Sequence, residues 1–188
     1  MAQLTVLAIC GSLRKNSYNK KLLLAACTNL KEEQCEINNL DLKQIDLPLF
    51  DQDIEDATGL PQGAVKLIDA IRTAQAVVIG CPEYNSGITG ALKNAIDWAS
   101  RADKNPFTDK IVLLVGTSPG HFAAIRSAMN TRGILTHLGA FVIPTQVNIP
   151  YADKAFDKEG NLTDPMHQKI LKAACLKLTE TAKSFAKK

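Results

Sequence analysis

Five short apolar segments, each separated from the next by a longer segment, restrict the fold of this chain more than any other feature. They cover residues 4–10, 35–40, 76–81, 111–116 and 139–144. Most are continuous apolar runs, which are typical of strands buried on both faces of a sheet. The second is the weakest, with alternation at Cys35 and Ile37. Helical periodicity lies between the strands, so the pattern predicts an α/β fold with one open parallel sheet and helices on both faces.

Apolar residues at helical spacing indicate which side of each helix should face the sheet. Asn16 or Ser17 can cap the first helix, and Pro61 opens the second. The expected apolar faces are Leu23, Ala26, Cys27 and Leu30 in the first helix, Ala64, Leu67, Ile68 and Ile71 in the second, Ile88, Leu92, Ala95, Ile96 and Ala99 in the third, Phe122, Ile125 and Met129 at the start of the fourth, and Leu171, Ala174, Leu178 and Phe185 in the last, which begins near Asp164.

A long acidic segment over residues 41–59 has little periodicity. A segment of this length inside a compact domain is usually functional or contacts another molecule. Leu47, Leu49 and Phe50 would be costly to leave in water. Two placements stay open, which are a contact with a second subunit and packing onto the chain's own sheet.

Length and charge exclude several classes of protein. The chain has 188 residues, which suits a single domain over residues 1–188. The net charge is only +3 and aromatic residues make up 5%, whereas nucleic-acid-binding proteins usually carry a basic surface with interleaved aromatics. Neither a membrane-length apolar run nor a signal-peptide pattern occurs, so we expect no membrane partner and a cytoplasmic location.

The cysteines and histidines do not form a metal-binding pattern. The five cysteines contain no CxxC pair, and the three histidines are scattered, so no metal site is expected. Cys10 ends the first predicted strand and could be a phosphatase nucleophile, but the low-molecular-weight tyrosine phosphatases need C-x5-R. Arg14 follows Cys10 by only four positions and Asn16 occupies the required one, so Cys10 is interpreted as a core residue.

The loop after the first strand, "GSLRKNS", has the composition of a phosphate-binding loop. It leads into a helix, whose N-terminus offers unpaired N–H groups and a partial positive charge. Ser12, Ser17 and Asn19 add side-chain donors, and Arg14 adds a guanidinium suited to phosphate oxygens. The alternative is that Ser17 is an ordinary N-cap and Arg14 a solvated charge.

The loops after the third and fourth long apolar runs, "PEYNSG" and "TSPGH", should lie beside the first, because ligands bind beyond the carboxyl ends of parallel strands. Pro82 stiffens its turn, and Gly87 and Gly90 let the backbone approach a flat ligand. Tyr84 could lie against a ring system. The alternative is that Tyr84 covers the end of the sheet and Glu83 caps a nearby helix.

Together, "GSLRKNSYNKKL" and "PEYNSGITGALKNAIDW" resemble the NADPH-dependent FMN reductase family of flavodoxin-like proteins, which includes bacterial quinone and chromate reductases. The resemblance implies a flavodoxin-like three-layer sandwich with a five-stranded sheet in the order 2-1-3-4-5. It also implies a homodimer or homotetramer with the flavins near the subunit boundary. The cofactor-binding residues that it implies are Ser12, Leu13, Arg14, Ser17, Tyr18 and Asn19 in the first loop, Pro82, Glu83, Tyr84 and Asn85 against the isoalloxazine, and Thr117 and Ser118 on the third side.

The resemblance further implies that NAD(P)H delivers hydride to FMN and leaves, and that a small oxidant then takes the electrons. Quinones are the main expected acceptors, with chromate, azo compounds and free flavin as further candidates. No residue need be catalytic, although Glu83 is a candidate proton donor and Arg101, Arg126 and Arg132 are candidates for a ribose phosphate. The alternatives are a flavodoxin-type electron carrier, which is typically strongly acidic and lacks an arginine like Arg14, and a flavin-binding sensor without turnover.

Overall fold

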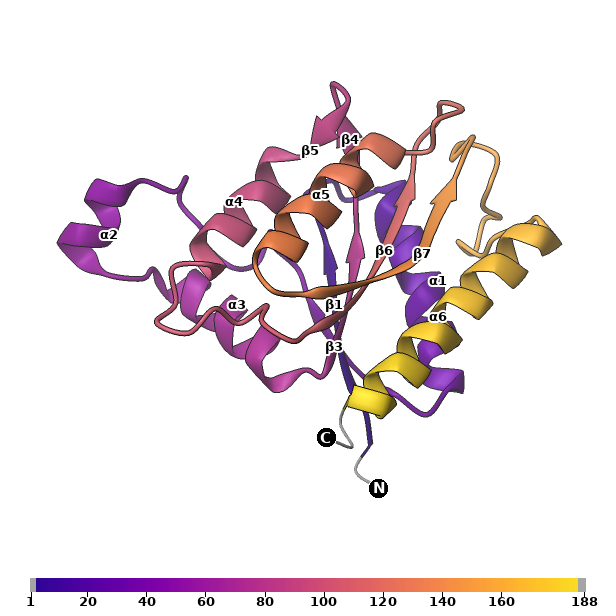
Figure 1. Cartoon of the computed structure of the whole chain (residues 1–188). Coiled ribbons are helices and arrows are strands. Elements are labelled where there is room, and N and C mark those ends of the chain that lie inside the picture. Colours follow the sequence, from indigo (N-terminus) through magenta and orange to yellow (C-terminus); the bar gives the residue numbers. More distant parts are fainter. Residues whose placement is uncertain (1–2, 186–188) are drawn as a thin grey trace.

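The computed structural model, which describes residues 3–185, has the predicted parallel sheet at its centre (Figure 1). The strands follow the order β2-β1-β3-β6-β7, and every neighbouring pair is parallel. Their bounds are Thr5–Cys10 for β1, Glu36–Leu40 for β2, Ala76–Gly80 for β3, Ile111–Thr117 for β6 and Phe141–Ile149 for β7. This confirms the order 2-1-3-4-5, because β4 (Glu83–Tyr84) and β5 (Gly87–Ile88) form a separate hairpin.

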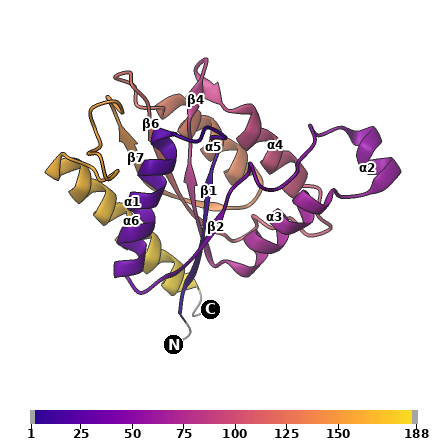
Figure 2. The ribbon, with the colours of Figure 1, turned by 180° about the vertical axis from the view of Figure 1, so that it is seen from behind.

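Helices cover both faces of the sheet (Figures 1 and 2). On one face lie α1 (Tyr18–Glu32) and α6 (Pro165–Phe185), and on the other α3 (Gln62–Thr73), α4 (Gly90–Ala99) and α5 (Ile125–His137). Strand β1 shows the division, because Val6 packs in the first core and Leu7 in the second. All residues of β3 and β6 are buried, as their continuous apolar sequences predicted.

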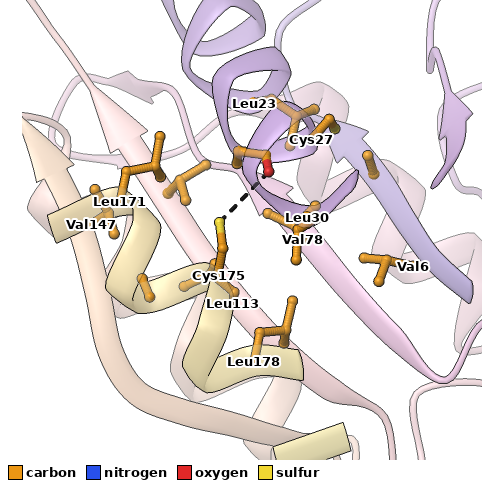
Figure 3. Close-up of a cluster of buried hydrophobic side chains, with 14 of the residues drawn as sticks. Val6, Leu23, Cys27, Leu30, Val78, Leu113, Val147, Leu171, Cys175 and Leu178 are labelled. Carbon is orange, nitrogen blue, oxygen red and sulfur yellow. Dashed lines mark hydrogen bonds between the residues drawn. The ribbon is translucent and has the colours of Figure 1, made fainter. Parts of the chain in front are cut away.

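The face covered by α1 and α6 is a regular apolar core (Figure 3). Leu30, Leu113 and Leu178 are fully buried there. The thiol of Cys175 in α6 donates a hydrogen bond to the carbonyl oxygen of Ala26 in α1, with a distance of 3.6 Å. Burial raises the pKa of Cys175 to about 12, so this thiol stays neutral and packs as an apolar side chain.

Two predicted element boundaries are resolved or corrected. Ser17, rather than Asn16, caps α1, because its Oγ accepts from the Lys20 N–H at 3.4 Å. The fifth strand does not end at Pro144 but continues to Ile149. Proline is tolerated there because β7 lies at the sheet edge and its register shifts between the partners Val112 and Leu114.

The expected apolar face at the start of the fourth long helix is wrong. Helix α5 begins at Ile125, and the exposed fractions are 58% for Phe122, 39% for Ile125 and 61% for Met129. The helix packs instead through small and polar residues together with one leucine, which are Ser127, Ala128, Thr131 and Leu135. Ile88 likewise lies in β5 and not in α4.

The acidic segment packs partly onto its own chain and partly projects from it. The Pro48 carbonyl oxygen accepts hydrogen bonds from Trp98 Nε1 at 2.8 Å and from Asn94 Nδ2 at 2.9 Å, and the Phe50 ring packs edge-on against Trp98. These contacts are with α4, whereas Leu42 and Ile45 at the start of the segment are buried in the core that includes sheet residues. Leu49 is 80% exposed, and the following helix α2 (Gln52–Thr58) buries none of its residues and projects from the body of the molecule (Figure 1). We call residues 47–59 the arm.

Within residues 3–185, no helix combines the length and the apolar character needed to span a bilayer.

Candidate functional site

The loops after β1, β3 and β6 meet at the carboxyl ends of the strands, which we call the carboxyl edge. The Gly11 N–H donates to the Gly80 carbonyl at 2.9 Å, and the Thr89 hydroxyl donates to the Gly11 carbonyl at 2.7 Å. A Cβ atom at Gly11 would lie 2.8 Å from Leu92 Cβ and 3.1 Å from Pro82 Cδ. Only glycine therefore lets the first loop pass so close to the second.

The first loop presents hydroxyl, guanidinium and amide donors around the N-terminus of α1. Ser12 is buried, and its Oγ accepts from the Arg14 N–H at 3.4 Å, while Ser17 Oγ accepts from Lys20. Both hydroxyl hydrogens therefore remain able to donate to a ligand. Arg14 is exposed at the mouth of the loop. This donor set fits one phosphate group.

Asn19 and Thr117 join α1 to the end of β6. Asn19 Nδ2 donates to the Thr117 carbonyl at 2.9 Å, and the Thr117 N–H donates to Asn19 Oδ1 at 3.0 Å. The Thr117 hydroxyl donates to the Ile149 carbonyl at 2.6 Å. Because of these hydrogen bonds, both residues mainly hold the first and third loops together. The side chain of Asn19 still has one N–H that could bind a ligand.

Leu13 and Tyr18 flank this loop in different ways. The Leu13 side chain is 43% exposed. The Tyr18 ring stacks on Phe156 from the segment after β7, with 6.4 Å between ring centroids, and Lys21 Nζ lies 5.9 Å from the Tyr18 centroid. Tyr18 therefore ties the first loop to the chain beyond β7.

The thiol of Cys10 is not activated as a nucleophile. Burial raises its pKa to about 11, and the opposing effects of the Ser12 N–H, the Lys20 charge and the Ser17 hydroxyl are smaller. A catalytic thiolate needs a lowered pKa. The spacing of Arg14 excludes the phosphatase motif, and the raised pKa of Cys10 agrees with this, so Cys10 is a core residue as predicted.

The second loop forms a tight hairpin of β4 and β5 at the carboxyl edge. Pro82 is buried, whereas Tyr84 is 52% exposed. Asn85 and Ser86 form the turn between β4 and β5, with φ of 52° and 63°. Positive φ at both central residues is the type I′ pattern, in which asparagine is favoured at the first position.

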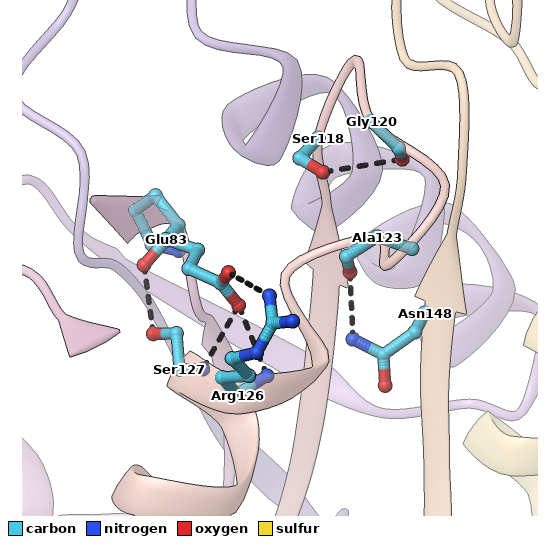
Figure 4. A network of polar contacts seen from close by, with 8 residues as sticks. Glu83, Ser118, Gly120, Ala123, Arg126, Ser127 and Asn148 are labelled. Carbon is cyan, nitrogen blue, oxygen red and sulfur yellow. Dashed lines mark hydrogen bonds and ion pairs between the residues drawn. The ribbon is translucent and has the colours of Figure 1, made fainter. Parts of the chain in front are cut away.

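Glu83 caps helix α5 from outside the helix (Figure 4). Its Oε2 accepts from the backbone N–H groups of Arg126 at 2.9 Å and Ser127 at 3.2 Å, and Arg126 Nη1 lies 3.4 Å from Oε1. The N-cap residue Ala124 offers no side-chain cap. A carboxylate at this position satisfies free N–H groups and interacts favourably with the helix dipole. Glu83 therefore anchors the second loop to α5.

The third loop, residues 118–124, is held by backbone and amide contacts. Ser118 Oγ donates to the Gly120 carbonyl at 3.4 Å, and Asn148 Nδ2 donates to the Ala123 carbonyl at 2.8 Å (Figure 4). Ser118 is partly exposed toward the edge. Sequence reasoning did not find Asn148, which has no local motif. Thr89 was also missed, although a threonine just before a helical pattern is an N-cap signal.

Two of the three candidate arginines are engaged away from the edge. Arg101 pairs with Glu55 of the arm at 2.8 Å, and Arg132 Nη1 donates to the Val142 carbonyl at 3.0 Å. Arg126 stands at the start of α5 beside Glu83. Of the three, it alone is placed to reach a ligand at the carboxyl edge.

Comparison with known proteins identifies the family. The family model for NADPH-dependent FMN reductase matches residues 4–154. The chain is 36% identical over 167 residues to an NAD(P)H-dependent FMN reductase of Pseudomonas aeruginosa, covering 88% of each chain, and 38% identical over 141 residues to a quinone reductase of Escherichia coli K12, covering 75% of this chain and 74% of that one. The solved structure of the flavoenzyme NAD(P)H:(acceptor) oxidoreductase FerB from Paracoccus denitrificans superposes with a TM-score of 0.84 at 31% identity, covering 96% of this chain and 98% of that one. Sequence and fold agree, and the chain belongs to the NADPH-dependent FMN reductase family.

Proposed function

We propose that this protein is an FMN-dependent NAD(P)H oxidoreductase that passes electrons to small oxidants, with quinones as the main class. The observation that carries the proposal is the donor set of the first loop, where Ser12, Arg14 and Ser17 come together with the N-terminus of α1, a combination that suits one phosphate. A relative named quinone reductase supports the acceptor class.

Each loop has a distinct part in holding the cofactor. Ser12, Ser17 and Arg14 bind the phosphate, while the Asn19–Thr117 hydrogen bonds set the distance between the first and third loops. Pro82, Tyr84 and Asn85 would present backbone and ring surface to the isoalloxazine, and Ser118 would contact it from the third loop. Bound FMN supplies the chemistry, because it accepts hydride from a nicotinamide and returns electrons to an oxidant.

No side chain is required as a nucleophile, and Glu83 is not the proton donor. Its carboxylate accepts three hydrogen bonds from α5, so it holds the second loop in place. The three loops would leave one site beside the flavin for donor and acceptor to use in turn, which predicts ping-pong kinetics.

The test has two parts. Heat should release FMN and not FAD from the purified protein, because the first loop suits the single phosphate of FMN and is not a G-x-G-x-x-G dinucleotide loop. Initial rates of NADPH or NADH oxidation with a quinone should give parallel double-reciprocal lines. Bound FAD would contradict the proposed phosphate site. Intersecting lines would show that both substrates bind at the same time and not in turn. FMN binding without turnover would favour an electron carrier or a sensor.

We also propose that the protein is a homodimer or homotetramer in the cytoplasm, and that the arm is a subunit contact. The arm supports this because Leu49 is 80% exposed on a segment anchored to α4 through Pro48 and Phe50. All five cysteines are free and buried, which suits a reducing compartment. Leu49→Asp should lower the mass measured by light scattering, whereas an unchanged mass would move the contact elsewhere.

A further inference from the structure

Three exposed aromatic side chains gather where the chain leaves β6 and β7. Phe122 is 58% exposed and Tyr151 is 50% exposed, and His121 lies between them. The His121 centroid is 5.8 Å from that of Phe122 and 6.2 Å from that of Tyr151, and His121 Nδ1 lies 3.3 Å from the Tyr151 hydroxyl. We call these three residues the aromatic rim. Exposed aromatic side chains that cluster in this way are typical of binding sites, whereas single exposed ones are common on any surface.

The backbone on either side of the rim is strained. Ala123 and Ala124 have φ of 51° and 62°, and Tyr151 has φ of 52°. Residues with a Cβ atom rarely adopt this conformation, and they cluster at ligand-binding positions when the surrounding structure enforces it. The surroundings do so here, because Asn148 holds the Ala123 carbonyl and Glu83 holds the first N–H groups of α5 (Figure 4). The exposure of Phe122 is therefore imposed by the fold.

A cationic side chain lies beside the aromatic rim. The Arg126 guanidinium carbon lies 4.3 Å from the centre of the Phe122 ring. Only Nη1 of this guanidinium contacts Glu83, at 3.4 Å, and the Arg126 side chain is 44% exposed. Arg126 thus covers part of Phe122 and keeps N–H groups for a second anion. An aromatic surface beside a guanidinium fits a flat ring that carries phosphate.

We propose that the aromatic rim binds the adenine ring of NAD(P)H and that Arg126 binds its phosphates. This inference rests on the proposed function. The chain has neither a G-x-G-x-x-G nor a G-x-x-x-x-G-K-[ST] sequence, so no separate nucleotide-binding loop is available for the adenosine half. With the nicotinamide at the flavin, the adenosine half of NAD(P)H would have to bind to the adjoining surface. The third loop joins Ser118, which the family resemblance assigns to the flavin site, to Phe122.

The direct test is calorimetric titration of ADP-ribose into FMN-loaded protein. ADP-ribose carries the adenine and both phosphates but has no nicotinamide, so it reports binding without turnover. Phe122→Ala should weaken binding about tenfold, because stacking of a base on an aromatic side chain is typically of this strength, about 1.4 kcal/mol. Phe122→Trp should restore it. Met129→Ala is the matched control, because Met129 is equally exposed, at 61%, but lies farther along α5.

Rapid-mixing kinetics separate the rim from the proposed function. Phe122→Ala should raise the NADPH dissociation constant for flavin reduction about tenfold and leave the limiting rate and the quinone KM unchanged. A raised quinone KM alone would make the rim an acceptor site, and a changed molecular mass would make it a subunit contact. Either result, or equal ADP-ribose affinity in Phe122→Ala and wild type, overturns the inference. Wild-type flavin that neither NADPH nor NADH reduces would contradict the proposed function, whereas the titration would still report on the rim.

Discussion

The core between α1, α6 and the sheet differs from the carboxyl edge in how the chain is held. In the core, residues such as Leu30, Leu113 and Leu178 lie at regular helix and strand positions and are fully buried (Figure 3). At the edge, single polar contacts such as Glu83–Arg126 and Asn19–Thr117 join segments 43 and 98 residues apart, and several residues have positive φ. We therefore expect stability to come mainly from the core and the geometry of the candidate site to come from the edge, so that mutations affect the two separately.

The largest effect on stability is expected in the core. Leu178→Ala removes a side chain with no exposure and should lower the free energy of unfolding by about 2–5 kcal/mol, because lost burial and a cavity add together. Urea unfolding of the apo-protein measures this loss. The FMN affinity of the folded fraction should not change. An equal loss of FMN affinity would show that the core and the edge are coupled.

Arg14→Ala should lower the affinity for FMN and leave stability nearly unchanged. We expect FMN affinity to fall about ten- to a hundredfold, because a charge-assisted hydrogen bond contributes about 1.5–3 kcal/mol. Stability of the apo-protein should hardly change, since the side chain is exposed. Fluorescence titration of FMN into apo-protein measures the affinity.

Two controls sharpen the result for Arg14. Lys15→Ala removes the same charge from the next exposed position and should leave FMN affinity near that of the wild type. Riboflavin lacks the phosphate, so its affinity should be low and should not respond to Arg14→Ala. Equal FMN affinity in the two variants would assign the phosphate to the serines and the backbone amides alone.

Substitutions of Glu83 test whether a contact at the carboxyl edge contributes to stability, to turnover or to both. Glu83→Ala should lower the free energy of unfolding by about 1–2 kcal/mol, because α5 loses its cap. Glu83→Gln keeps an oxygen acceptor and should lose less stability. Turnover in Glu83→Gln should stay within a few-fold of the wild type over the pH range measured. A drop of a hundredfold or more in a stable Gln variant would instead assign Glu83 as a proton donor.

The smallest expected change is one in the free energy of unfolding, and it should have opposite signs in the two regions. Ala124→Gly removes a Cβ atom from a left-handed residue and should raise the free energy of unfolding by up to about 1 kcal/mol. Ala173→Gly makes the same change at an exposed position inside α6 and should lower it by about 1 kcal/mol. Thermal unfolding of both variants measures the contrast. Destabilisation of similar size in both would show that the left-handed alanines carry little strain.

Much of the fold could be predicted because burial leaves a local record in the sequence. Strands β1, β3 and β6 are buried on both faces and therefore read as continuous apolar runs. Prediction failed where burial does not follow apolarity. Helix α5 packs through Ser127 and Thr131, and Phe122 and Met129 face water, so its apolar pattern pointed away from the core. The sequence predicted too early an end for strand β7, because proline usually ends a strand except at the edge of a sheet.

The family and the loops of the candidate site could be predicted from the sequence, because the two motifs are contiguous and strand order brings their loops to one edge. Tertiary structure alone decided how the side chains divide their work. Glu83 caps a helix that begins more than forty residues later, Asn19 is committed mainly to Thr117, and Asn148 fixes the loop that exposes Phe122. Such contacts depend on distances between segments far apart in the chain, and no local pattern of residues encodes those distances.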